Sequence, residues 1–367
     1  MPKKLNIGFV LDDTLDTPDG VQQYVLTVGE WLKQQGHTVH YIVGHTTRQD
    51  IDNVHSMARN VRVKFNQNKL SIPLPANKKL LHKKLLELQL DVLHVQMPYS
   101  PLFAGRVIKA VPPTTKVIGT FHIVPATWLE RSGARTLQII TRSTLRRFNA
   151  IASVSPAAQS FAKTVFGINS VVIPNAVSLS TFRRRPIYLD TIQIVFLGRL
   201  VERKGCIWLL RALKIVQDAT DIPYAVTIAG KGELRQKMEA FVKDNAIRNV
   251  TFVGFVEESS KPDLLAKADI TTFPSTAGES FGIVLIEAMA AGSRVVIGGN
   301  NVGYSSVLSD KPELLVDPKN SQAFAETLLH FITNKAVRKE TLAWNKKTVE
   351  QYDINIVGNN LLDLYNK

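Results

Sequence analysis

Two carboxylates with seven residues between them are the first candidates for binding a hydroxyl-rich ligand. Glu279 and Glu287 lie in the stretch Gly278-Glu-Ser-Phe-Gly-Ile-Val-Leu-Ile-Glu-Ala-Met-Ala-Ala-Gly292. Ser280 predicts a helix start and Gly292 a helix end, so a helical rise would separate the carboxylates by about 12 Å. Carboxylates accept hydrogen bonds from hydroxyls, and free N–H groups at a helix start suit a diphosphate. An ordinary amphipathic helix with one exposed glutamate would show the same spacing.

Two basic residues after a predicted strand suit the same diphosphate. Arg199 follows the apolar run 192–197, and Lys204 lies five residues later at a predicted helix start. A bound diphosphate carries negative charge, which two fixed cations can neutralise without a metal ion. Arg203 beside them is interpreted as part of a solvated basic turn.

Further motifs occur along the chain in the order of a known family. They are Asp19-Gly-Val-Gln22, Asp91-Val-Leu-His94, Thr120-Phe-His122, Ile173-Pro-Asn175, Phe196-Leu-Gly-Arg199 and Arg203-Lys-Gly205, before the Glu279 stretch. With these motifs the chain resembles the retaining glycosyltransferases of family 4 over nearly its whole length. Within that family it looks most like the phosphatidylinositol α-mannosyltransferases. Several motifs in one order are far more specific than any one of them.

The resemblance implies a role for each matched position. Arg199 and Lys204 would stabilise the departing diphosphate, and Glu279 would hold sugar hydroxyls. His122 would hydrogen-bond the transferred sugar and complete the catalytic set. Gln22 would contact the acceptor head group, although the residues alone equally allow an exposed helix position. Other donor contacts would come from Glu287 at the ribose, from Phe281, Gly282 and Ile283 at the phosphates, and from Gly230, Gly254 and Val256 near the base.

The loop after the first predicted strand contains the candidate acceptor residues. Gly20 precedes a predicted helix, where its N–H can meet the donor phosphates or the acceptor. Asp12, Asp13 and Asp16 follow the strand, and Asp16 is expected to accept hydrogen bonds from acceptor hydroxyls. A metal-binding role for these aspartates is not favoured. His94 is interpreted as structural or acceptor-side, and the dispersed histidines predict no metal cofactor.

Composition is that of a globular protein with a basic first half. The chain has 367 residues, of which 45% are hydrophobic and 21% charged, and its one cysteine, Cys206, excludes an internal disulfide. No apolar run reaches the roughly 20 residues of a membrane-spanning helix. Residues 1–175 carry 21 Lys and Arg against 10 Asp and Glu, a net of +11, whereas residues 176–367 carry 24 against 21. This asymmetry predicts an anionic partner: a membrane surface, nucleic acid or a phosphorylated acceptor.

Apolar runs alternate with helical patterns, which predicts an α/β fold built from βαβ units on parallel sheets. Strands are expected at 5–10, 38–43, 91–95, 116–121, 150–154 and 170–173, and again at 192–197, 225–229, 250–253, 269–273 and 294–297. We expect an acceptor-binding Rossmann-like domain at 1–175 and a donor-binding one at 176–351. The resemblance implies that they face a cleft, the GT-B architecture, and that a last helix at 352–367 crosses back to the first domain.

A basic helix is predicted at 78–88. Its charged face holds Lys78, Lys79, His82 and Lys83, and its opposite face holds Leu81, Leu85 and Leu88. Such a helix can lie on anionic lipid with some apolar insertion, or its leucines can pack on the sheet while its lysines face water. The charge of the first half and the lipid acceptor of the similar family favour membrane contact. The expected location is cytoplasmic, at the inner face of the membrane.

The expected function is metal-independent, retaining transfer of a hexose from a nucleotide sugar to a lipid-linked or polyol-phosphate acceptor such as phosphatidylinositol. Closest resemblance implies mannose from GDP-mannose, with a UDP-hexose as the other donor. In this hypothesis the departing phosphate itself takes the acceptor proton and no protein nucleophile is required, which fits the lack of an evident nucleophile–base pair. The alternatives are the same chemistry on a soluble glycan or sugar-phosphate acceptor, a sugar-nucleotide epimerase, and a nucleic-acid-binding protein. Sparse aromatics beside the basic residues disfavour the last.

Overall fold

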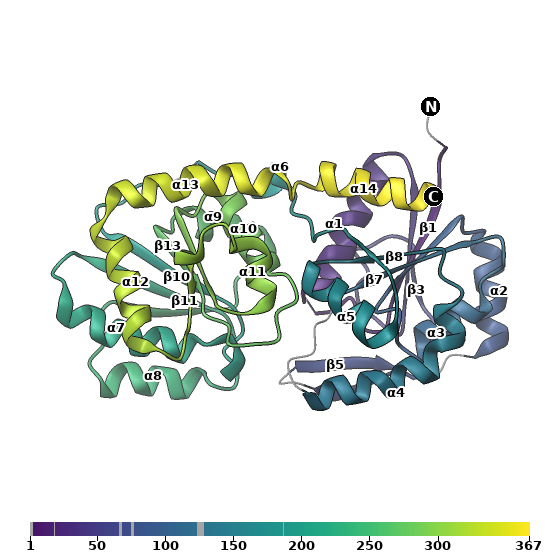
Figure 1. The fold of residues 1–367 in the computed structure, drawn as a ribbon, viewed down its shortest axis with the longest axis horizontal. Helices are drawn as coiled ribbons and strands as arrows, with labels where there is room; N and C mark the ends of the chain where they lie inside the picture. The colour runs from purple at the N-terminus through teal and green to yellow at the C-terminus, as the bar shows by residue number, and fades with distance from the viewer. Residues whose placement is uncertain (1–2, 18, 66–67, 75–76, 123–127, 186) are drawn as a thin grey trace. The chain divides into compact units, whose positions relative to one another are not determined.

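The chain forms two α/β units, each a parallel sheet flanked by helices (Figure 1). The computed structural model describes residues 3–17, 19–65, 68–74, 77–122, 128–185 and 187–367. The first unit comprises Met1–Ala176 together with Ile354–Lys367, and the second comprises Val177–Asp353. The expected α/β class is confirmed, including the return of the last helix to the first unit.

The sheet of the first unit has the spatial order β3-β2-β1-β6-β7-β8-β9, with parallel neighbours throughout. Its strands are β1 (Asn6–Leu11), β2 (Thr38–Val43), β3 (Val54–Ser56), β6 (Val92–Gln96), β7 (Lys116–Phe121), β8 (Ala150–Ser153) and β9 (Val171–Val172). A separate antiparallel hairpin is formed by β4 (Asn60–Phe65) and β5 (Asn68–Pro73). The helices are α1 (Gly20–Gln34), α2 (Lys78–Leu88), α3 (Phe103–Ala110), α4 (Trp128–Leu145), α5 (Pro156–Phe166) and α14 (Ile354–Asn366).

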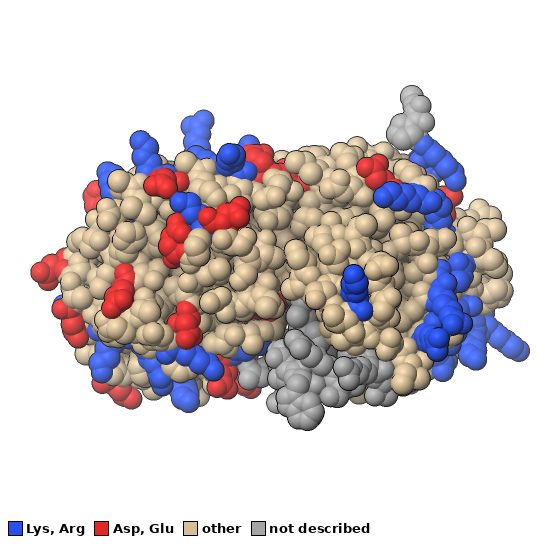
Figure 2. All heavy atoms as spheres, in the orientation of Figure 1, with Lys and Arg blue, Asp and Glu red and all other residues tan. Residues whose placement is uncertain are grey.

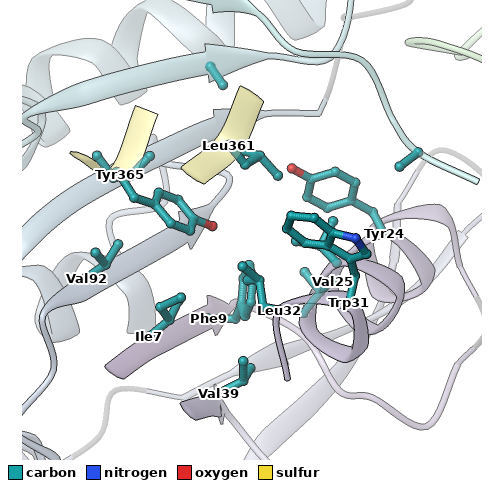
Figure 3. Close-up of a cluster of buried hydrophobic side chains, with 14 of the residues drawn as sticks. Ile7, Phe9, Tyr24, Val25, Trp31, Leu32, Val39, Val92, Leu361 and Tyr365 are labelled. Carbon is teal, nitrogen blue, oxygen red and sulfur yellow. The ribbon is translucent and has the colours of Figure 1, made fainter. Parts of the chain in front are cut away.

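The last helix, α14, is part of the core of the first unit. Leu361 and Tyr365 point into a cluster of buried side chains that includes Phe9 from β1 and Trp31 from α1 (Figure 3). Trp31 Nε1 donates a hydrogen bond to Asn355 Oδ1 at 2.9 Å. Because burial of large apolar side chains is the main favourable term in folding, these contacts fix the last helix to the first unit.

The sheet of the second unit has the order β12-β11-β10-β13-β14-β15, again parallel. Its strands are β10 (Ile192–Leu197), β11 (Tyr224–Ala229), β12 (Val250–Gly254), β13 (Ile270–Phe273), β14 (Val295–Gly299) and β15 (Leu315–Val316). The helices are α6 (Leu179–Phe182), α7 (Cys206–Ala219), α8 (Arg235–Asp244), α9 (Lys261–Ala266), α10 (Ile283–Ala291), α11 (Val302–Leu308), α12 (Ser321–Thr333) and α13 (Lys335–Glu350), with short 3-10 turns at Glu202–Lys204, Glu258–Ser260 and Pro312–Leu314.

The strands expected from apolar runs are present, with ends within about two residues of those predicted. Strands β3 and β15 and the β4–β5 hairpin were not predicted, because they are short or polar and carry little periodic signal. Cys206 is buried and free at the start of α7.

Candidate active site

The second unit places its candidate residues where the order of its strands reverses. β10 pairs with β11 on one side and with β13 on the other. The loops after β10 and β13 therefore leave the sheet side by side at its carboxyl edge, where open α/β sheets bind ligands. The first loop carries Arg199, Arg203 and Lys204, and the second carries Ser275 and Glu279.

The carboxylate of Glu279 is held through one of its oxygens. Oε1 accepts hydrogen bonds from Arg203 Nη1 at 2.8 Å, from Lys204 Nζ at 2.8 Å and from Ser275 Oγ at 2.7 Å. Burial opposes ionisation of Glu279, but the charges of Lys204 and Arg203 outweigh it and lower the pKa of the carboxyl. Glu279 is thus an oriented carboxylate whose second oxygen takes no part in these three bonds.

Arg203 belongs to this cluster, so its interpretation as a solvated turn residue was wrong. Its side chain is largely buried, and its backbone oxygen accepts the N–H of Thr276 at 2.8 Å, which joins the two loops. Burial lowers the pKa of Lys204, Glu279 opposes this effect, and the nearby charges of Arg203 and Arg199 add to it. The structure therefore gathers three cations where the sequence analysis assigned two. In the sequence, the signal for a third cation at this site was that Arg203 is directly next to Lys204.

Glu279 lies outside the helix that it was expected to open. α10 begins at Ile283, and its N-cap is Gly282 with φ 106°, a left-handed conformation that favours glycine. Ser280 is therefore not the cap, and the separation of about 12 Å along one helix does not apply. The N-cap residue of α10 is a glycine and makes no side-chain cap, so the N–H groups of the first turn are suited to a phosphate. Gly292 ends the helix in a left-handed conformation, as predicted.

The loop that carries Glu279 contacts the start of α11, which holds it in place. Asn301 caps that helix by accepting the N–H of Tyr304 at 3.0 Å, and its Nδ2 donates to Ser275 O at 3.0 Å. Gly303 lies so close to the Glu279 backbone that a Cβ would overlap it. The sequence analysis missed both residues, because their role depends on a neighbouring loop.

Glu287, on the second turn of α10, is buried beside a lysine. Lys261 Nζ lies 3.5 Å from Glu287 Oε2 and 2.8 Å from Glu258 Oε2. Burial raises the pKa of Glu287, and the charge of Lys261 offsets part of that rise. Lys261 is a further polar residue that the sequence analysis did not single out.

The glycines expected near the base adjoin one another at the carboxyl edge. Gly230 N–H donates to Gly254 O at 2.6 Å, and both glycines have positive φ. Phe281 stacks edge-on against Tyr352 at 5.5 Å and is buried, so only its backbone can meet a ligand. Val256, two residues after Gly254, and Ile283, the first residue of α10, are half-buried.

His122 is buried at the carboxyl edge of the first sheet, directly after β7. Its Nε2 lies 2.5 Å from Gln96 Oε1, at the end of the neighbouring strand β6. Tyr24 of α1 packs edge-on against the imidazole at 5.0 Å. Burial lowers the pKa of His122 to about 3, so the ring is neutral at physiological pH.

His94 is structural, which is one of the two roles expected of it. Its ring lies between Tyr365 Oη and Thr120 Oγ1, at 2.7 Å from each, and it is fully buried. Burial, with a contribution from His122, lowers its pKa to about 3.

The expected acceptor residues lie in the loop after β1 and at the start of α1. Gly20 opens α1, which has no side-chain cap. Gln22 is only 3% exposed and donates to Thr14 O at 3.1 Å, so the exposed alternative was wrong. Asp16 accepts from Thr46 Oγ1 at 2.5 Å and Thr47 N at 2.8 Å, and thereby ties this loop to the one after β2. Burial raises the pKa of Asp16, but these hydrogen bonds outweigh that effect, so the pKa lies below its ordinary value.

Asp12 reaches across to a different helix. Its Oδ1 accepts the N–H of Ala104 at 2.6 Å in the first turn of α3, whose N-cap residue makes no side-chain cap. Burial raises the pKa of Asp12 to about 7, more than this bond lowers it, and Asp13 adds to the rise. Asp12 thus has a structural role, as the cap of α3.

The basic helix α2 exists at its predicted position, but its apolar face is not available for insertion. Leu81, Leu85 and Leu88 are buried in a core cluster of the first unit. The charged face is exposed, and lysine side chains gather over α2 at the right-hand edge of Figure 2. Exposed residues on that side are Lys78, Lys79, Leu80, His82, Lys83, Leu86 and Glu87.

Two general features bear on the chemistry. Among the described residues, no group of three His, Cys, Asp or Glu side chains is arranged to hold a metal ion. No helix in the described part of the chain combines the length and the apolar character needed to cross a membrane.

Comparison with known proteins covers both units. Residues 18–181 match the family model described as Glycosyltransferase Family 4, and residues 179–349 match the one described as Glycosyl transferases group 1. The phosphatidyl-myo-inositol mannosyltransferase of Mycolicibacterium smegmatis is 29% identical over 374 residues, covering 98% of this chain and 93% of that protein. The enzyme of the same name from Mycobacterium tuberculosis is also 29% identical, with 98% and 96% covered.

Solved structures share the fold over the full length. A glycosyltransferase from Rickettsia africae has a TM-score of 0.76 at 19% identity, covering 99% of this chain and 98% of that one. HepE from Anabaena, solved in complex with UDP and glucose, has a TM-score of 0.76 at 16% identity, with 99% and 100% covered. With a family model over each unit and the fold of these enzymes, the chain belongs to the glycosyltransferases of family 4.

Proposed function

We propose that this enzyme transfers mannose, with retention of configuration, from GDP-mannose to phosphatidylinositol or a closely similar polyol-phosphate lipid. The observation that carries the proposal is likeness over 98% of the chain to enzymes named phosphatidyl-myo-inositol mannosyltransferases. The UDP bound in HepE supports a nucleotide sugar as the general donor class.

The geometry of the second unit supports transfer by leaving-group stabilisation. Arg199, Arg203 and Lys204 offer positive charge to a diphosphate, and the uncapped start of α10 adds backbone N–H donors. Glu279 shares two of these cations, so it acts as their counter-charge until phosphate oxygens take over part of that role. Its remaining oxygen is the group we assign to the sugar hydroxyls. Glu287 is assigned to the ribose, and Gly230, Gly254 and Val256 to the base.

The first unit supplies the acceptor side of the proposal. Gly20 lies at an uncapped helix start, and its N–H suits a phosphate of the donor or the acceptor. Gln22 and Asp16 shape the loop after β1, and we assign the acceptor head group to that loop. His122 is assigned to a hydroxyl of the transferred sugar as a neutral hydrogen-bonding group, since its pKa is too low for an acid at neutral pH.

Membrane contact is proposed to rest on charge, with α2 as its centre. Lys78, Lys79, His82 and Lys83 face outward, whereas the leucines behind them hold the helix to its own unit. Near an anionic surface each such lysine contributes about 1 kcal/mol of attraction. Shallow contact by Leu80 and Leu86 is compatible with this geometry, because both are exposed on the same helix.

A direct assay tests the proposal. The purified enzyme is incubated with GDP-mannose and vesicles that contain phosphatidylinositol, and lipid products are identified by mass spectrometry and by the anomeric coupling of the new glycosidic bond. The expected product is an α-mannoside of the lipid. Matched reactions with UDP-glucose, and with free inositol phosphate in place of vesicles, decide the donor and the acceptor class. Transfer only to a soluble glycan or sugar phosphate, or turnover of the nucleotide sugar without an acceptor, would refute the proposal.

A further inference from the structure

In the amide orientation that the structure shows, the hydrogen bond between Gln96 and His122 has one direction, and Gln96 Nε2 is buried without a hydrogen-bond partner among the described residues. An amide oxygen has no proton to give, so the 2.5 Å contact requires that His122 Nε2 carry the proton and donate to Gln96 Oε1. The neutral imidazole then has its lone pair on Nδ1. His94, two residues before Gln96 on the same strand, differs in this respect. Both of its partners are hydroxyls, which can donate or accept, so either tautomer satisfies them.

Gln96 is placed to impose this choice. Its side chain is fully buried, and its backbone pairs with Thr120 in the parallel register of β6 and β7. The next residue, Met97, has φ 60°, an unusual conformation for a residue other than glycine, and it ends the strand at this point. Met97 N–H donates to Thr120 O of β7 at 3.1 Å, which ties the end of β6 to the neighbouring strand.

The surroundings keep the ring of His122 neutral. Among the described residues, the titratable groups that face it are Tyr24 from α1 and His94 from β6. Neither supplies a negative charge at neutral pH, because burial raises the pKa of Tyr24 and lowers that of His94. Burial also holds the pKa of His122 well below its usual range. The imidazole can therefore serve as a hydrogen-bond acceptor over the working pH range.

We propose that Gln96 is a positioning residue that fixes His122 in its Nε2–H tautomer, so that Nδ1 accepts a hydrogen bond from a hydroxyl of the transferred sugar. The sugar contact rests on the function proposed above, whereas the tautomer does not. Gln96 itself touches His122 and not the substrate. It acts on the reaction through the orientation and protonation of the ring, as groups behind a ligating or catalytic histidine commonly do.

Two substitutions of nearly equal volume separate the possibilities. Gln96→Met removes the acceptor and leaves both tautomers open. Gln96→Glu keeps an acceptor oxygen at the same place but adds a negative charge, which raises the pKa of His122. Tyr365→Phe serves as the control, because it removes a partner of His94 and none of His122.

The first measurement is the imidazole region of long-range ¹H–¹⁵N spectra, recorded without ligand between pH 5 and 8. The wild type is expected to show His122 neutral and protonated on Nε2. Gln96→Met should shift its nitrogens toward averaged values, whereas Tyr365→Phe should move only the signals of His94. A wild-type His122 protonated on Nδ1, or one unchanged by Gln96→Met, overturns the proposal whatever the enzyme transfers.

The second measurement is the rate of mannosyl transfer from GDP-mannose to phosphatidylinositol vesicles. Gln96→Met should lower kcat about tenfold, the equivalent of one ordinary hydrogen bond, and leave KM for GDP-mannose nearly unchanged. Gln96→Glu should retain activity in alkaline buffer and lose it on acidification, because protonated His122 cannot accept at Nδ1. A structural role alone would predict no such pH dependence, and its absence would count against the proposal. A wild type that transfers nothing refutes the proposed function, while the spectra still decide the tautomer.

Discussion

At the scale of single residues, the site depends on carboxylates and imidazoles whose charge is set by their neighbours. Glu279 remains ionised although it is buried, because Lys204 and Arg203 donate to it. His122 remains neutral because it is buried with no anion among its described contacts. Asp12 is the opposite case to Glu279, since burial dominates and its pKa rises. Three buried groups thus have different charge states for identifiable physical reasons.

Replacement of Glu279 by Gln should separate transfer from nucleotide binding. The amide keeps an oxygen for the cations but loses the negative charge, so transfer should fall by about 10²–10³-fold. GDP should bind as tightly as before or more tightly, because its phosphates no longer compete with the carboxylate for Arg203 and Lys204. Steady-state rates and calorimetric titration with GDP measure the two effects. Glu326→Gln, an exposed position on α12, is the control, and a fully active Glu279→Gln variant would disprove the assigned role.

Asp12 should make stability depend on pH in the direction opposite to most carboxylates. Its folded-state pKa, about 7, lies above the unfolded value of 3.8. Its contribution is therefore complete below pH 3.8 and is lost as pH rises through 7, at roughly 1.4 kcal/mol for each pH unit between these two pKa values. Asp12→Asn keeps an acceptor for Ala104 N–H and cannot ionise. Urea unfolding should show the variant equal to wild type near pH 4 and more stable by a few kcal/mol at pH 8. An equal difference at both pH values would contradict this role.

At the scale of elements, loops that follow neighbouring parallel strands build the site. The loops after β10 and β13 meet because β10 lies between β11 and β13, and Asn301 of α11 holds the second loop in place. In the first unit, β6 and β7 end side by side, which brings Gln96 to His122. α14 supports that arrangement, because Tyr365 forms a hydrogen bond with His94 and other side chains of α14 pack in the core of the first unit. The last helix is therefore part of what positions the first unit's polar residues.

The contribution of α14 can be measured with two substitutions on the same helix. Leu361 is 0% exposed within the core, so Leu361→Ala should lower the free energy of unfolding by about 2–5 kcal/mol. Ile356 is 48% exposed, so Ile356→Ala should change it by no more than about 0.5 kcal/mol. Chemical denaturation followed by fluorescence compares them. Equal effects of the two substitutions would mean that α14 is not packed on the core as described.

At the scale of the whole molecule, charge is distributed unequally along the chain. Residues 1–175 have a net charge of +11. In the view of Figure 2, many of the Lys and Arg side chains of the first unit lie over α2. The burial of Leu81, Leu85 and Leu88 means that α2 cannot turn its apolar face to a lipid bilayer without leaving its own core. Attraction between this helix and a membrane must then be mainly electrostatic, and therefore sensitive to salt.

Charge reversal on α2 should weaken binding to anionic vesicles. Lys79→Glu with Lys83→Glu removes two positive charges and adds two negative ones, so co-sedimentation with phosphatidylglycerol vesicles should fall by at least about tenfold in low salt. The difference should largely disappear at high salt, where screening shortens the reach of each charge. Lys237→Glu with Lys243→Glu on α8, two exposed lysines of the second unit, is the matched control. Equal loss in both double variants would show that net charge matters and α2 does not.

The α/β class, most strands and the identity of the motif residues could be predicted from the sequence, because apolar periodicity and glycine placement are local properties. The sequence also predicted Arg199 and Lys204 after the strand at 192–197 and His122 after the strand at 116–121, which places them at the carboxyl edges of the sheets. Glu279 was expected at a helix start, whereas α10 begins only at Ile283. Which side chains contact one another could be learned only from the folded chain. Arg203 joined Glu279, Gln22 was buried, and the leucines of α2 packed inward, because each outcome depends on a neighbour distant in sequence. Burial and charge pairing are properties of the folded surroundings, and no local pattern encodes them.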